Sequence, residues 1–353
     1  MRAVVWLAAL MVAAGQLFVT APARAEDLPQ LHLKVAGGLG GVRQYNNFEE
    51  PFWTRTLRDQ SAGRITAEIA PFDSMGLRSG EVMNLLRLGV LSFGSTPLAP
   101  LAADDAESVA LDLPGLNPDI ETLRRHVFSY RDTLVRVYRE RYNVEILSIY
   151  TYPAQVLFCN GPLRSLMDLA GKRVRVSGVV QADMVMRLNA TPINAPFNQI
   201  VETMRRRAID CAITGTLSGN AIRLHEVATT LFTLPINWGI NILAVNREYW
   251  RSLPPSVRSF LTDQLAVLER EIWANAQYET QQGIACNGGS VECVLGQRAA
   301  MTVVSPPESD RQLLQRILHD TILPRWAERC GEDCVATWNA SVGRAAGLAA
   351  PTP

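Results

Sequence analysis

The sequence predicts an α/β protein built from two successive sets of strands and helices. The first set opens as β-α-β, with strand-like alternation at 31–35 and 64–69 and an apolar-periodic segment at 48–57 between them. A second set of strand patterns follows at 155–159, 173–176 and 209–214. Because alternating strand and helix patterns are typical of parallel-type sheets, we expect two α/β lobes.

Long helices follow both sets of strands. Residues 120–142 carry apolar side chains at helical spacing, and a second such pattern begins after Pro255 and runs past Trp273. The chain has no Ser/Gly-rich or Pro-rich linker that would leave the lobes loosely connected. We therefore expect long connecting helices to tie the two lobes together.

Composition excludes disorder and gives no sign of a nucleic-acid partner. The chain has 353 residues, of which 48% are hydrophobic, and its 34 Lys+Arg balance 34 Asp+Glu. This apolar content is typical of a folded globular protein. The mixed charges offer no basic surface of the kind that contacts phosphates, so we expect no nucleic-acid partner.

The amino terminus has the pattern of a secretory signal peptide. Arg2 precedes a largely apolar run at 3–19, and the run is followed by Ala23-Arg24-Ala25. The alternative is a membrane anchor, which needs roughly 20 apolar residues and would not be followed directly by a cleavage pattern. We therefore expect residues 1–25 to be removed after Ala25 and the mature protein to lie in the periplasm.

The six cysteines predict disulfides, because thiols can pair in an oxidising compartment outside the cytoplasm. Two pairs are close in sequence and the third is formed by the two cysteines that remain. The predicted pairs are Cys286–Cys293, Cys330–Cys334 and Cys159–Cys211. A zinc site is the alternative, but no Cys-x-x-Cys spacing or neighbouring histidine supports it.

No motif predicts catalysis, a metal or a cofactor. The glycine run at 37–41 does not have the G-x-G-x-x-G spacing of a dinucleotide site, and 215–219 lacks the G-x-S-x-G spacing of a nucleophile elbow. The four histidines, His32, His126, His225 and His319, lie far apart without metal-ligand spacing. We expect a protein that is not an enzyme, although an exported α/β hydrolase is an alternative.

Two arginines interrupt the predicted strand Arg173-Val-Arg-Val176. One interpretation is an edge strand with both side chains in solvent. The other places an arginine at the carboxyl end of a strand, where ligands of open α/β sheets bind. A guanidinium there is suited to a carboxylate, which it can hold through two parallel hydrogen bonds.

An ordered series of segments resembles the TRAP-type (tripartite ATP-independent periplasmic) solute-binding proteins, the DctP-like family. The segments lie at 111–114, 166–176, 189–192, 197–200, 207–210 and 245–254. Each match is short, but their order extends the resemblance from about residue 31 to residue 273. The resemblance implies a two-lobed periplasmic binding protein fold with a hinge, which closes on an organic acid and delivers it to the membrane components of a TRAP transporter.

The resemblance also suggests how the chain divides. We expect a first lobe of 28–153 plus 240–282, and a second lobe of 154–239 plus 283–353 that includes the C-terminal helices. We expect a monomer. A receptor that presents its ligand to a sensor protein is a further alternative for a chain of this kind.

The resemblance assigns site residues one by one. Arg175 matches the arginine that pairs with the substrate carboxylate, Gln155 stands where many members have a second arginine, and Thr214 stands where many have an asparagine. Residues at and near Gly41, Tyr45, Asn46 and Thr96 are expected to supply the first lobe's share of the site.

The departures at Gln155 and Thr214 favour a monocarboxylate, because a neutral amide cannot neutralise a second carboxylate. Trp238 would add an aromatic wall, with a plain core tryptophan as the alternative. Arg43 is the residue that would supply a second cation if the ligand were a dicarboxylate.

Overall fold

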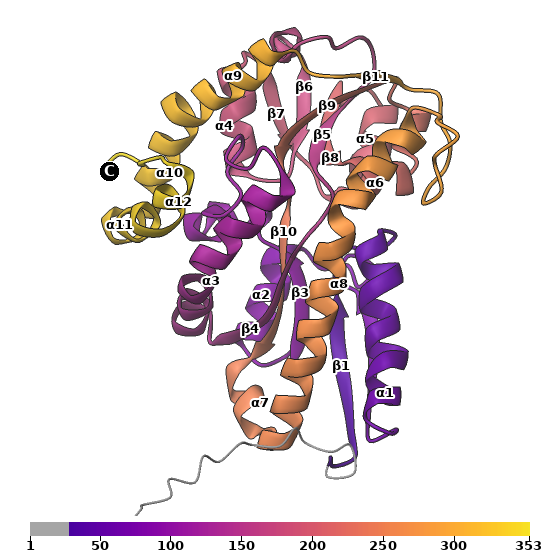
Figure 1. The fold of residues 1–353 in the computed structure, drawn as a ribbon, viewed down its shortest axis with the longest axis vertical. Helices are drawn as coiled ribbons and strands as arrows, with labels where there is room; N and C mark the ends of the chain where they lie inside the picture. Colours follow the sequence, from indigo (N-terminus) through magenta and orange to yellow (C-terminus); the bar gives the residue numbers. More distant parts are fainter. Residues whose placement is uncertain (1–27) are drawn as a thin grey trace, which may run out of the picture.

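The computed structural model describes residues 28–353, and the predicted signal peptide with its cleavage after Ala25 lies outside them. Two β-sheets lie one above the other, each covered by helices (Figure 1). Among the described helices, none is both long and apolar enough to cross a bilayer.

The first sheet has five strands. In spatial order they are β2 (Ile65–Pro71), β1 (Leu31–Gly37), β3 (Phe93–Pro97), β10 (Ile240–Asn246) and β4 (Val144–Thr151). β1 pairs in parallel with β2 and β3, whereas β10 is antiparallel to both of its neighbours. β3 therefore lies where the parallel part of the sheet meets the antiparallel part.

The second sheet has six strands. In spatial order they are β11 (Thr302–Val304), β9 (Thr230–Asn237), β5 (Gln155–Cys159), β8 (Cys211–Gly215), β6 (Arg173–Val176) and β7 (Thr191–Asn194). β5 is antiparallel to β8 and β9, and the other neighbouring pairs are parallel. Each sheet thus contains one strand that is antiparallel to both of its neighbours, β10 in the first sheet and β5 in the second. In the chain, each of these two strands directly follows a strand of the other sheet.

Two short crossings join the sheets. One connects β4 to β5 through 152–154 and the other connects β9 to β10 through 238–239. The crossings are adjacent, since the Tyr152 N–H donates to the Gly239 carbonyl at 3.1 Å. Gly239 has φ of +81°, a left-handed conformation that glycine adopts without strain.

Helix α8 (Pro255–Asn287) is the third connection. Its 33 residues extend along both sheets, as Figure 1 shows, and a helix of this length spans about 50 Å. Pro255 suits the first helical position, because a backbone N–H at that position has no partner within the helix and proline has no N–H.

The predicted long helix at 120–142 is α3 (Ile120–Tyr142). The Asp119 carboxylate caps its N-terminus by accepting the Thr122 N–H at 2.7 Å.

The remaining helices cover the sheets or follow them. They are α1 (Leu57–Gln60), α2 (Ser79–Arg87), α4 (Val179–Arg187), α5 (Ile200–Arg205), α6 (Thr216–Ala221), α7 (Arg247–Ser252), α9 (Glu308–Ile317), α10 (Leu323–Cys330), α11 (Glu332–Trp338) and α12 (Arg344–Ala346).

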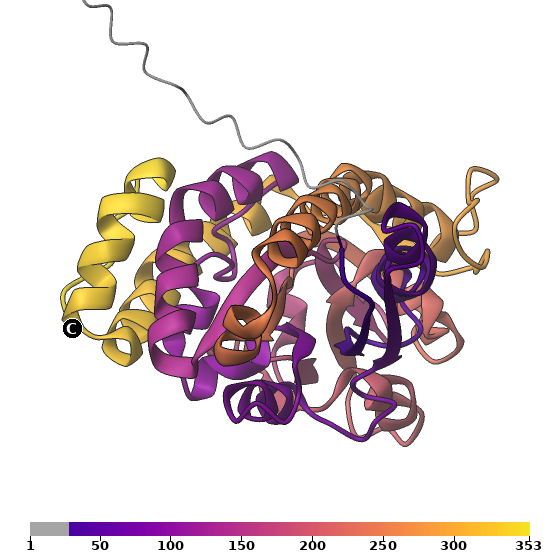
Figure 2. The same ribbon diagram turned by 90° about the horizontal axis from the view of Figure 1, so that it is seen from below.

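The C-terminal helices contact both halves of the molecule, and Figure 2 shows them beside α3. On one side, the indole N–H of Trp326 donates to the Ala106 carbonyl at 2.8 Å. On the other, Asp183 of α4 accepts hydrogen bonds from Arg325 at 2.9 Å and Arg329 at 2.6 Å. These contacts hold the end of the chain against elements that precede and follow the first crossing.

The disulfides join the three pairs that the sequence predicts: Cys159–Cys211, Cys286–Cys293 and Cys330–Cys334. The first pair links facing residues of β5 and β8 in the middle of the second sheet. The second closes the loop that follows α8, and the third joins α10 to α11.

Candidate functional site

A cleft of about 900 Å³ lies between the two sheets and is lined from both. Its first wall comes from the segments at 72–81 and 97–100, which follow β2 and β3. Its second wall comes from the ends of β6 and β8 and from 194–199 after β7. The lining therefore gathers at the carboxyl ends of parallel strands, the usual place for a ligand in open α/β sheets.

Arg175 is the buried cation of this cleft. Its residue exposure is 5%, its Nε donates to the Ala195 carbonyl at 2.9 Å, and its Nη1 donates to the Ile213 carbonyl at 2.8 Å. Burial lowers the pKa of its guanidinium to about 10, so it remains charged at neutral pH. Within residues 28–353 it has no carboxylate partner, and its Nη2 makes no hydrogen bond.

Arg173 lies on the same strand as Arg175 but, unlike Arg175, is paired with a carboxylate. Its guanidinium contacts the Asp210 carboxylate twice, with Nη2 to Oδ1 at 2.7 Å and Nε to Oδ2 at 3.0 Å. β6 lies between β7 and β8, so the edge-strand interpretation is wrong. The ion pair neutralises Arg173, whereas Arg175 has no counter-ion among residues 28–353.

Three polar side chains line the cleft together with Arg175. Gln155 donates its amide to the carbonyls of Pro153 at 3.0 Å and Trp238 at 3.2 Å. Thr214 and Ser218 are buried in the lining, and the Ser218 hydroxyl has no hydrogen-bond partner in the described chain. The structure therefore brings three predicted site residues together, Arg175, Gln155 and Thr214.

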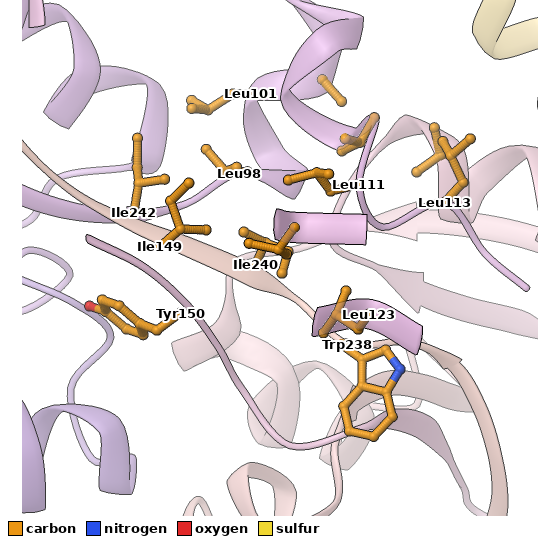
Figure 3. Packing of buried hydrophobic residues seen from close by; sticks show 14 of the residues in the cluster. Leu98, Leu101, Leu111, Leu113, Leu123, Ile149, Tyr150, Trp238, Ile240 and Ile242 are labelled. Atoms are coloured by element: carbon orange, nitrogen blue, oxygen red, sulfur yellow. The ribbon is translucent and has the colours of Figure 1, made fainter. Parts of the chain in front are cut away.

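Four other predicted site residues do not line the cleft. The Tyr45 hydroxyl lies 3.3 Å from the Ile69 carbonyl, Asn46 is exposed on a helical turn, and Thr96 is fully buried in β3. The indole N–H of Trp238 donates to the Asn117 carbonyl at 3.0 Å. Figure 3 shows its ring among buried hydrophobic residues, which corrects the predicted aromatic wall in favour of a core tryptophan.

Arg43 is also absent from the lining. Its Nε lies 3.2 Å from the carboxylate of Glu279 on α8, whose side chain is almost fully buried. Arg43 is thus paired with Glu279 and lies outside the lining, so Arg43 does not supply a second cation to the cleft.

The first wall contains charged residues that sequence reasoning missed. Asp73 accepts the backbone N–H groups of Gly40 at 3.0 Å and Ser74 at 3.1 Å through the same oxygen. Arg78 and Glu81 form a largely exposed ion pair at 3.6 Å. The signal that would have found this segment is its position, directly after the predicted strand at 64–69.

The chain matches a known family over most of its length. The family described as bacterial extracellular solute-binding protein, family 7 (DctP), matches residues 44–312. A relative from Rhodobacter capsulatus, the C4-dicarboxylate-binding periplasmic protein DctP, is 24% identical over 272 residues, which cover 74% of this chain and 80% of that protein.

Solved structures share the fold. A TRAP periplasmic solute-binding protein from Desulfovibrio salexigens with bound orotic acid has a TM-score of 0.78 and 14% identity, covering 89% of this chain and 99% of its own. One from Rhodoferax ferrireducens with bound malonate has a TM-score of 0.77 and 20% identity, covering 89% of this chain and 98% of its own. The two-sheet arrangement with its long α8 is thus the fold of these binding proteins.

Proposed function

This chain belongs to family 7 of the bacterial extracellular solute-binding proteins, the DctP family, and we propose that it captures a monocarboxylate in the cleft and delivers it to the membrane components of a TRAP transporter. Members of this family are extracytoplasmic receptors for solutes and not enzymes. We further propose that residues 1–25 direct export and are removed after Ala25, and that the mature protein acts as a monomer.

The single observation that carries the proposal is the unpaired charge of Arg175. A buried guanidinium without a counter-ion is costly, and a protein retains it where a ligand supplies the missing charge. Its two protein hydrogen bonds hold Nε and Nη1, which leaves Nη2 available for a carboxylate oxygen. The Thr214 and Ser218 hydroxyls lie on the same wall and can donate to the carboxylate as well.

The other charges of the cleft favour one carboxylate over two. Arg78 is the second arginine of the lining, but Glu81 already pairs with it and its side chain is 80% exposed. Asp73 adds a negative charge, and Gln155 offers only a neutral amide. Of the ligands bound by the two solved relatives, orotic acid has one carboxyl group and malonate has two. Support for a monocarboxylate therefore comes from this chain's own charges.

Movement of the two sheets about the crossings would give the ligand access. We propose lobes of 28–153 plus 240–282 and 154–239 plus 283–353, hinged at 152–154 and 238–239. Closure around a ligand by rotation at such short connections is the usual mechanism of periplasmic binding proteins.

A thermal-shift screen of organic acids tests the function. A ligand that binds only the folded state raises the melting temperature, so a monocarboxylate should stabilise the wild type more than a dicarboxylate of equal length does. Arg175→Ala should weaken binding at least about tenfold, because a charge-assisted contact is lost. Arg173→Ala is the matched control, since its side chain is outside the cleft lining. Unchanged affinity in a folded Arg175→Ala variant would overturn the proposal.

A further inference from the structure

We propose that Asp73 makes the cleft selective for carboxylates that carry a hydrogen-bond donor, a hydroxyl or an ammonium group, at the end remote from the carboxylate. The inference rests on the function proposed above, because it takes Arg175 as the carboxylate site. It assigns the other end of the ligand to the first wall of the cleft.

The position of Asp73 leaves one carboxylate oxygen free. The residue lies in the turn after β2 and is partly exposed in the cleft lining. Oδ1 accepts both backbone N–H groups, from Gly40 and Ser74, and these bonds orient the side chain. Oδ2 has no hydrogen-bond partner in the part of the chain that the structure describes, and a carboxylate oxygen can only accept.

The neighbours of Asp73 do not neutralise it. No Lys, Arg or His of residues 28–353 forms an ion pair with it, and Arg78 on the same segment is paired with Glu81. The phenol of Tyr152 lies in the lining nearby, and its pKa is raised by burial first, then by the charge of Glu49, and also by that of Asp73. Tyr152 therefore stays protonated, and its hydroxyl donates a hydrogen bond to the Asn241 side-chain oxygen at 3.3 Å.

The two walls of the cleft thus present opposite charges. Arg175 offers donors for a carboxylate, and Asp73 offers an acceptor to the opposite end of the ligand. A hydroxyl or ammonium group satisfies Asp73, whereas a methyl group leaves it unpaired and a second carboxylate meets a fixed like charge. Specificity then arises from attraction at one end and repulsion at the other.

Calorimetric titration with ligands of equal length tests this assignment. One series is butyrate, γ-hydroxybutyrate, γ-aminobutyrate and succinate, and a longer one is hexanoate, ω-hydroxyhexanoate, ω-aminohexanoate and adipate. In at least one series, the hydroxyl or amino member should bind the wild type about tenfold more tightly than the methyl member, and the dicarboxylate should bind most weakly. The comparison of hydroxyl with amino members identifies the donor.

The variant Asp73→Asn removes the charge but keeps an oxygen for Gly40 and Ser74. It should gain about tenfold in affinity for the dicarboxylate and lose about tenfold for the amino member, with little change for the hydroxyl member. Asp104→Asn is the control, because Asp104 is exposed and outside the lining. Melting temperatures of both variants verify folding.

Failure of this inference is distinguishable from failure of the proposed function. If Asp73→Asn leaves the order of the ligands unchanged while Arg175→Ala abolishes binding, Asp73 is not the selective residue and the carboxylate function stands. If the wild type binds the methyl member as tightly as the donor-bearing members, or binds neither series, the inference is overturned. The wider panel of acids then still decides the proposed function.

Discussion

The carboxylate of Asp112 accepts a hydrogen bond from the backbone N–H of Gly239 at 2.6 Å. It also accepts the Trp238 N–H at 2.9 Å and the Asn237 side-chain amide at 2.9 Å. All three donors lie at the crossing from β9 to β10, so a side chain from the first half of the chain holds this connection. Burial raises the pKa of Asp112 to about 6, and the three donors partly oppose that rise.

Asp112→Ala should destabilise the crossing, because the buried N–H of Trp238 and the part-buried N–H of Gly239 lose their acceptor. We expect the free energy of unfolding to fall by about 2–3 kcal/mol, measured by urea denaturation at pH 7. Asp104→Ala, at an exposed site, should change it by less than about 0.5 kcal/mol. Equal stability of the two variants would show that the contact at Gly239 contributes little.

Arg175→Met should stabilise the ligand-free protein while abolishing binding. The pKa of Arg175 is lowered to about 10, which means that burial disfavours its charged form. Replacing an unpaired buried charge by an apolar side chain of similar length should raise the free energy of unfolding by about 1–3 kcal/mol. A loss of stability without ligand would indicate instead that the bonds to Ala195 and Ile213 outweigh the cost of burial.

Glu49 should make stability depend on pH. Its carboxyl accepts the Tyr150 hydroxyl at 2.6 Å and the Gly38 N–H at 2.7 Å, and burial raises its pKa from 4.5 to about 7. The folded state therefore retains a proton that the unfolded state releases, so stability is lost as pH rises from 4.5 to 7.

The loss amounts to about 3 kcal/mol and should be complete above pH 7. Glu49→Gln stays neutral, so its free energy of unfolding should vary less between pH 5 and pH 8 than that of the wild type. The pKa of Asp112 is also raised, so Asp112 titrates in the same direction in both proteins and contributes to the slope that remains in the variant. Parallel pH profiles from urea denaturation would refute the assignment.

The disulfide between Cys159 and Cys211 should contribute more to stability than the one between Cys330 and Cys334. The first disulfide joins cysteines with a sequence separation of 52, and the second joins cysteines with a sequence separation of 4. The loss of chain entropy in the unfolded state predicts about 4 kcal/mol and about 2 kcal/mol, respectively. Paired Cys→Ala variants in urea titrations measure both, and the reverse order would contradict this prediction.

Gly178→Ala should weaken ligand binding by obstructing closure. A β-carbon at Gly178, which precedes α4, would lie 2.3 Å from the Ala99 carbonyl oxygen on the opposite wall. The φ of Gly178 is −175°, an extended conformation that alanine adopts without strain, so the effect comes from that contact. Small-angle scattering with saturating ligand should show a larger radius of gyration for the variant than for the wild type, and equal dimensions would argue against closure at this contact.

Much of the fold was predictable because its signals are local. The helix predicted at 120–142 has those bounds in the structure, since its apolar spacing and the Asp119 cap lie within the segment itself. The family predicted from the ordered segments is confirmed by the match over residues 44–312, and the two-sheet fold by the solved relatives. The export signal and Ala25 lie outside the described residues and stay a prediction.

The candidate site was only partly predictable. The resemblance singled out Arg175, Gln155 and Thr214, and all three line the cleft. It also suggested Tyr45, Asn46 and Thr96, and the position of Trp238 beside Gly239 suggested an aromatic wall. None of these four residues lines the cleft. The position after the strand at 64–69 marks the segment of Asp73 but not the residue itself, since a polar residue in a turn is common and its role depends on the opposite wall of the cleft.

By itself, the sequence determined the alternation of strands and helices, the three cysteine pairs and the presence of two arginines in one strand. Only the tertiary structure decided that Arg173 would pair with Asp210 while Arg175 would be buried without a counter-ion. It also decided that Asp73 would line the same cleft. The physical reason is that secondary structure follows from side chains a few residues apart, whereas the charge and solvation of a side chain depend on groups that distant segments bring beside it.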